Sequence, residues 1–86
     1  MFGDKDLKRL KTALDDGKIA MQVGPRLGAK AMEVATQNIS SDILAAAMRM
    51  HAAARTSETV DLISAARVGA NNAWNQILDV VLEEIA

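Results

Sequence analysis

The sequence feature that most constrains the fold is a mostly apolar series in the last third of the chain, spaced by three and four residues in turn. Its members are Val60, Ile63, Arg67, Ala70, Trp74, Ile77 and Val81, with Ile85 one turn further on. This is the spacing of one helix face, and no proline interrupts it. It predicts a single long helix over about residues 57–85, with Ser57 as N-cap. Such a helix is about 40 Å long, so we expect the rest of the chain or a second copy to cover it.

Small residues recur within the same stretch. Ala65, Gly69 and Ala73 are each four residues apart, and small side chains at that spacing let another helix approach closely. Gly69 weakens a helix by about 1 kcal/mol relative to alanine, which favours a packing role for it. The alternative is a helix that only tolerates one glycine.

The first quarter of the chain carries clear breaking signals. Residues 4–16 are predicted to form a helix that Gly17 ends in the left-handed conformation. Ile19, Met21 and Val23 recur at every second position of residues 19–23, which is typical of a strand. The sequence offers no partner strand, so a connector or a short helix stays open. Pro25 is expected at the first position of the next helix.

The middle of the chain is predicted to be helical over residues 26–38 and 42–55. The serine-rich stretch between them favours a break, with Ser40 or Ser41 as the next N-cap. One continuous helix over residues 25–55 is the alternative. The short connection that follows predicts an antiparallel hairpin between residues 42–55 and the last helix.

The composition also favours packed helices. Sixteen of the 86 residues are alanine, and the only aromatic residues are Phe2 and Trp74. Thin side chains of this kind suit closely packed helices better than sheets. We therefore predict one all-α domain over residues 1–86, a three- to four-helix hairpin or bundle with a long C-terminal helix.

The location of the protein is expected to be cytoplasmic. The chain has no cysteine, so a disulfide framework or a thiolate metal site is excluded. Its beginning is charged from Asp4 onward, unlike a signal peptide. No uncharged apolar run approaches the ~20 residues that a membrane span needs, so no membrane partner is expected.

Charge is unevenly distributed along the chain. Residues 1–30 carry seven Lys or Arg against four Asp, whereas residues 57–86 carry one Arg against five acids. A basic beginning and an acidic end favour contact between the first helix and the last one, within a chain or between neighbouring copies. The alternative is an uneven surface charge without a role.

Catalytic and metal-binding motifs are not found. His51 is the only histidine and has no His or Cys to join it as a metal ligand. The acidic pairs Asp15-Asp16 and Glu83-Glu84 are neighbours in sequence, so the two carboxylates of each pair diverge on a helix. They are expected to be solvated. With no nucleophile and base to name, we predict a protein that is not an enzyme and needs no cofactor.

A small anionic ligand is one alternative function. The turn at residues 24–28 has two glycines and Arg26 before a helix, which can suit a phosphate, but the Lys-Ser/Thr of a phosphate-binding loop is missing. Arg26, Arg49 or Arg55 at an oligomer interface would be the binding residues.

A DNA-binding regulator is the other alternative, with a degenerate helix-turn-helix at residues 62–78. The residues from Ala70 to Ala86 contain no Lys or Arg and three acids. A recognition helix that faces phosphates needs the opposite charge, so nucleic acid is not an expected partner.

The function we predict is a non-enzymatic protein–protein interaction or self-assembly module, a homo-oligomer formed through the long C-terminal helix. The predicted interface residues are Val60, Ile63, Ala65, Gly69, Ala73, Trp74, Ile77 and Val81. Trp74 is the expected anchor, because Trp is enriched at interface hot spots. Beside it, Asn71, Asn72, Asn75 and Gln76 form a polar ridge that either sets the register of a helix interface or faces water.

Overall fold

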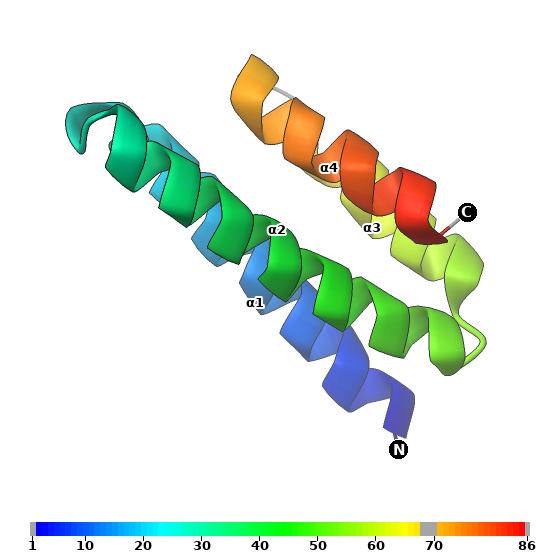
Figure 1. Cartoon of the computed structure of the whole chain (residues 1–86). Coiled ribbons are helices and arrows are strands. Elements are labelled where there is room, and N and C mark those ends of the chain that lie inside the picture. Colours follow the sequence, from blue (N-terminus) through cyan, green and yellow to red (C-terminus); the bar gives the residue numbers. More distant parts are fainter. Residues whose placement is uncertain (1, 68–70, 86) are drawn as a thin grey trace.

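The computed structural model describes residues 2–67 and 71–85. Its elements are α1 (Phe2–Val23), the 3-10 turn η1 (Gly24–Arg26), α2 (Ala29–Ala52), α3 (Thr56–Ala66) and α4 (Asn72–Ile85). Neither described range contains a strand, and the all-α prediction is confirmed with four helices. Figure 1 shows two antiparallel hairpins, α1 with α2 and α3 with α4, packed side by side into an elongated bundle of 40 × 19 × 19 Å.

The first hairpin is longer than the sequence predicted. Helix α1 continues through Gly17 to Val23, so the predicted end at Gly17 is wrong. Residues 19–23 are helical, which was one of the three possibilities left open. Among the described residues, the glycine with a positive φ is Gly28, at 89°. It lies after η1, directly before α2, where the chain reverses.

Helix α2 is one element, so the favoured break at the serine-rich stretch is wrong. The buried residues Ile43, Ala46, Ala47 and Met50 give α2 a core-facing stripe that starts immediately after that stretch. Packing of this stripe against the neighbouring helices outweighs the weak helix propensity of the serines.

The long C-terminal helix predicted over residues 57–85 is also wrong, because α3 and α4 replace it. Asn71 begins α4: its Oδ1 accepts a hydrogen bond from the Trp74 N–H at 2.8 Å, and its carbonyl accepts one from the Asn75 N–H at 3.1 Å. That is the geometry of an asparagine N-cap. At the other helix start, Ser57 lies inside the first turn of α3, and Arg55 occupies the N-cap position.

The two hairpins pack around Trp74, which is 1% exposed. Its indole Nε1 donates a hydrogen bond to the Ala66 carbonyl at 2.9 Å, which ties α4 to the end of α3. On its other side, a Cβ placed on Gly17 would lie 2.9 Å from Trp74 Cζ3 and 2.9 Å from Ile39 Cγ2. Gly17 is therefore a point of close approach between α1 and both α2 and α4.

The core that surrounds Trp74 takes residues from all four helices. The buried apolar side chains are Leu10, Leu14, Met21, Ile43, Ala46, Ala47, Met50, Ile63, Ile77, Leu78, Val81 and Ile85. Helix α2 contacts both α1 and α4 closely, so it is the element that joins the two hairpins.

Gly17→Ala is expected to destabilise the fold although alanine is the better helix former. The new methyl group meets a rigid, buried indole, and overpacking of this kind costs about 1–3 kcal/mol. Urea unfolding followed by far-ultraviolet circular dichroism, which does not depend on Trp74, measures the loss. Introducing the same change into a Trp74→Phe chain is the control, because phenylalanine lacks the indole atoms that clash. An equal loss in both backgrounds would contradict this packing.

Ala54→Gly is expected to stabilise the protein. Ala54 has a φ of 61°, a left-handed conformation that costs a residue with a Cβ about 1–2 kcal/mol. The Ala54 N–H bonds to the His51 carbonyl and the Arg55 N–H to the Met50 carbonyl, the pattern of a helix end that favours glycine at this position. We expect a gain of about 1 kcal/mol, which raises Tm by about 4–8 °C. An unchanged or lower Tm contradicts the turn geometry.

Candidate docking surface

Some of the residues predicted to form an interface are buried in the structure, and others are exposed. Ile63, Trp74, Ile77 and Val81 are buried in the core of the single chain. Val60, Ala65 and Ala73 are exposed, and Gly69 lies outside the described residues. Ala65 and Ala73 belong to different helices, so the predicted small-residue stripe is not one helix face. The chain itself covers the apolar face of α4 that contains Trp74, Ile77 and Val81, so that face is not available to another molecule.

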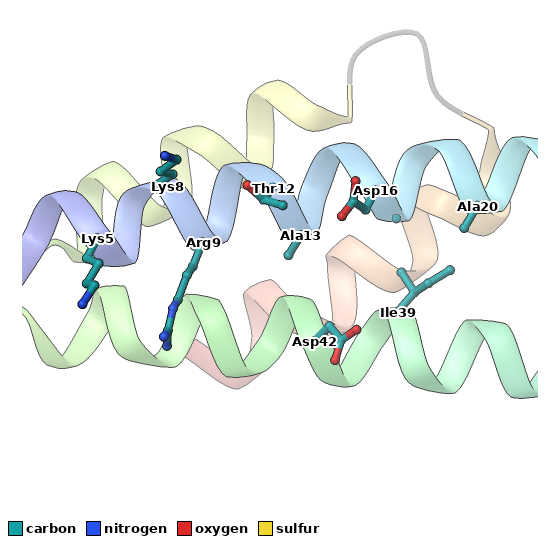
Figure 2. Close-up of a pocket in the computed structure, with 10 residues that line it drawn as sticks. Lys5, Lys8, Arg9, Thr12, Ala13, Asp16, Ala20, Ile39 and Asp42 are labelled. Carbon is teal, nitrogen blue, oxygen red and sulfur yellow. The ribbon is translucent and has the colours of Figure 1, made fainter.

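A continuous groove runs along α1 and α2 on the side turned away from α3 and α4; we call it the outer groove (Figure 2). Its central part is a hollow of about 610 Å³. The lining residues are Lys5, Lys8, Arg9, Thr12, Ala13, Asp16, Gly17, Ala20, Ile39 and Asp42. A smaller hollow of about 240 Å³ shares Arg9, Ala13 and Asp42 and extends the groove to Arg49. A third, of about 380 Å³, shares Asp16 and Ala20 and extends it toward η1.

One end of the outer groove is basic. Lys5 and Arg9 project from α1 toward α2 in Figure 2, and Arg49 lines the same end from α2. The ion pairs found among the described side chains join Arg55 to Asp4, Arg55 to Glu58 and Arg67 to Asp79. None of them uses a cation of the groove, so these charges are available to an acidic group of another molecule.

The other end of the outer groove is apolar; we call it the apolar tip. Ile19, Val23 and Leu27 line it and are 60%, 48% and 58% exposed. The cause is a difference in length, since α1 and α2 have 22 and 24 residues whereas α3 and α4 have 11 and 14. In Figure 1 the η1 end of the first hairpin reaches beyond the start of α4. Adjoining large apolar side chains without cover are typical of a surface that binds another molecule.

Arg55, a predicted ligand residue, is engaged within the chain. Its Nε and Nη2 donate hydrogen bonds to the two carboxylate oxygens of Glu58, the second at 2.6 Å. Its Nη1 lies 3.7 Å from Asp4 Oδ1. The hydrogen bonds with Arg55 lower the pKa of Glu58 from its ordinary value, and those with Glu58 raise the pKa of Arg55. Arg55 therefore joins the start of α3 to the start of α1. Of the other two candidates, Arg26 is exposed on η1, and only Arg49 lies on the groove.

Arrangements typical of catalysis are not evident in the described ranges. His51 is exposed, and its Nδ1 lies 3.0 Å from Thr56 Oγ1. Residues 2–67 and 71–85 contain no cluster of three side chains able to hold a metal ion. Both acidic pairs, Asp15-Asp16 and Glu83-Glu84, are solvent-exposed, as expected.

In the helix-turn-helix alternative, α4 is the recognition helix that faces the DNA. Its exposed side chains are those of Asn72, Ala73, Gln76, Val80, Glu83 and Glu84. They include two acids and no cation, which does not suit a phosphate backbone. None of the helices in the described part of the chain combines the length and the hydropathy that a membrane crossing needs.

Comparison of the chain with protein-family models, with curated proteins and with solved structures finds no match. The proposed function is therefore inferred from the outer groove. The sequence did not indicate this groove. The alternation of Ile19, Met21 and Val23 suggested a strand. Helix α1 places Ile19 and Val23 on the groove only because it continues past Gly17.

Proposed function

We propose that the protein is a non-enzymatic interaction module that self-associates through the outer groove of α1 and α2. The observation that carries the proposal is the apolar tip, where Ile19, Val23 and Leu27 remain about half exposed or more beside a hollow. Leaving a Leu or Ile side chain in water instead of burying it forgoes about 1.5–3 kcal/mol. A second molecule that covers all three therefore gains a substantial part of the free energy of association.

The size of a stable contact indicates that the whole groove takes part. A specific protein interface buries about 800 Å² on each partner, and the surface of the described chain is 5551 Å². Three side chains at the apolar tip cannot supply such an area. The groove continues from them to Arg49, so an elongated partner such as a helix fits it better than a small ligand does.

Other parts of the sequence-based interpretation stay predictions. They are the absence of enzymatic activity, the cytoplasmic location and the role of Trp74 as a contact anchor. For Trp74, burial at 1% favours a role in the core. A Trp74→Ala chain is then expected to lose folding and association together.

The test is the solution mass of Val23→Asp/Leu27→Asp, measured by light scattering after size exclusion over a wide concentration range. We expect the native chain to associate and the variant to be monomeric, because two carboxylates at the apolar tip oppose burial. Val60→Asp is the matched control, since Val60 is an exposed apolar residue on α3. A native chain that is monomeric throughout would overturn self-association. An equal effect of Val60→Asp would place the contact on another face.

A further inference from the structure

We propose that the outer groove of one copy binds the exposed ridge of α4 from a second copy, in a head-to-tail contact. The ridge consists of Ala73, Gln76, Val80 and Glu84, all exposed; the first three also border a hollow of about 700 Å³ between α4 and α2. This inference rests on the proposed self-association and names the two surfaces that form it. It differs from the interface predicted from the sequence, which used the buried face of the same helix.

Charge is the first reason to choose this occupant. Glu83 and Glu84 are exposed at the end of α4, which has no basic residue in its last turn. Acidic side chains are unfavourable at a helix C-terminus, where the dipole is negative. The ion pairs of the described chain leave both acids, and Lys5 and Arg9 of the groove, without a partner of opposite charge. A contact between copies brings these two sets of unpaired charges together.

The spacing of residues is the second reason. On α1, Arg9, Ala13, Asp16 and Ala20 line the groove, and the last lies eleven positions after the first. On α4, Glu84 likewise lies eleven positions after Ala73. Both lengths are about 16 Å at the rise of an α-helix, so an antiparallel ridge has a matching register.

That register places complementary groups opposite one another. Glu84 lies at Arg9, Val80 at Ala13 and Ala73 at Ala20, and Gln76 lies one position away from Asp16. Val80, 49% exposed in the single chain, gains cover from small groove residues that allow a close approach. The Gln76 amide is a donor that suits the carboxylate of Asp16. The apolar tip continues one turn beyond Ala20, next to the Ala73 end of the ridge.

A groove-on-groove dimer is less favourable by the same reasoning. If two grooves related by a two-fold axis run parallel, the cations of one face the cations of the other. If they run antiparallel, the basic end of each groove faces the apolar tip of the other. The groove and the ridge are different surfaces without a shared residue, so each copy can use both at once. Such a contact builds a ring if the rotation closes and a filament if it does not.

Charge reversal in two separate chains tests the pairing. One chain carries Lys5→Glu/Arg9→Glu, and the other carries Glu83→Lys/Glu84→Lys. In each variant alone, groove and ridge have the same charge, so we expect association to weaken about tenfold or more, since like charges across an interface cost several kcal/mol. In an equimolar mixture every contact joins opposite charges again. Light scattering is expected to show association restored to near the native strength, with the two variants incorporated in equal amounts.

Lys11→Glu/Lys30→Glu is the matched control, because it reverses two exposed cations that do not line the outer groove. Circular dichroism and the fluorescence of Trp74 establish that each variant is folded. If the native chain associates but the groove and ridge variants behave like the control, or if the mixture stays dissociated, the groove–ridge contact is wrong while self-association stands. If the native chain is monomeric, the proposed function and this contact fail together.

Discussion

The contact between Trp74 and Gly17 is the interaction on which the rest of the bundle depends. The indole lies against Gly17, a buried position of α1 without a side chain, and its Nε1 donates a hydrogen bond to the Ala66 carbonyl at 2.9 Å. One side chain thereby joins α1, α3 and α4, and Ile39 brings α2 to the same point. Among the described core residues, which are otherwise Ala, Leu, Ile, Val and Met, Trp74 is the large aromatic group that fills the space between the two hairpins.

The outer groove follows from that arrangement. The short hairpin of α3 and α4 covers only the inner side of α1 and α2, so their opposite side faces solvent along its length (Figure 2). Residues that fit closely there are small, such as Ala13, Gly17 and Ala20. Such small side chains do not fill the space between α1 and α2, so a shallow groove remains. The difference in helix length then leaves the apolar tip uncovered, and this produces a groove that changes from basic to apolar.

The helical class and part of the core could be predicted from the sequence, whereas the connections between the helices could not. Ile63, Trp74, Ile77 and Val81 of the predicted stripe are buried, whereas Val60 and Arg67 of the same stripe are exposed. The buried members share one period because a helix face has the same period on either side of a break. For that reason the period gave no sign that the chain reverses between α3 and α4. The available sign was Asn71, a strong N-cap residue, within a stretch assigned to the helix interior.

The helix breaks predicted at Gly17 and at Ser40 or Ser41 were wrong for a related reason. Gly17 has the sequence character of a helix end, but a neighbouring indole requires a residue without a Cβ at that point. Ser40 and Ser41 resemble caps, but the packing stripe of α2 carries the helix through them. In both cases tertiary packing determines the role of the residue. The outer groove requires α1 to continue past Gly17 and α2 to continue through Ser40 and Ser41. The sequence predicted a break at both places, so the groove could not be predicted from the sequence alone.

The most direct test of the account is cysteine cross-linking between copies, since the native chain has no cysteine to give a background. Ala13→Cys and Val80→Cys are prepared in separate chains, mixed and oxidised mildly. The account predicts a disulfide between the two different variants, because the ridge of α4 places Val80 over Ala13 in the groove. It predicts far less product when Ala13→Cys is mixed with Val60→Cys from α3. Equal cross-linking in both mixtures, or dimers of one variant with itself as the main product, would contradict the head-to-tail contact.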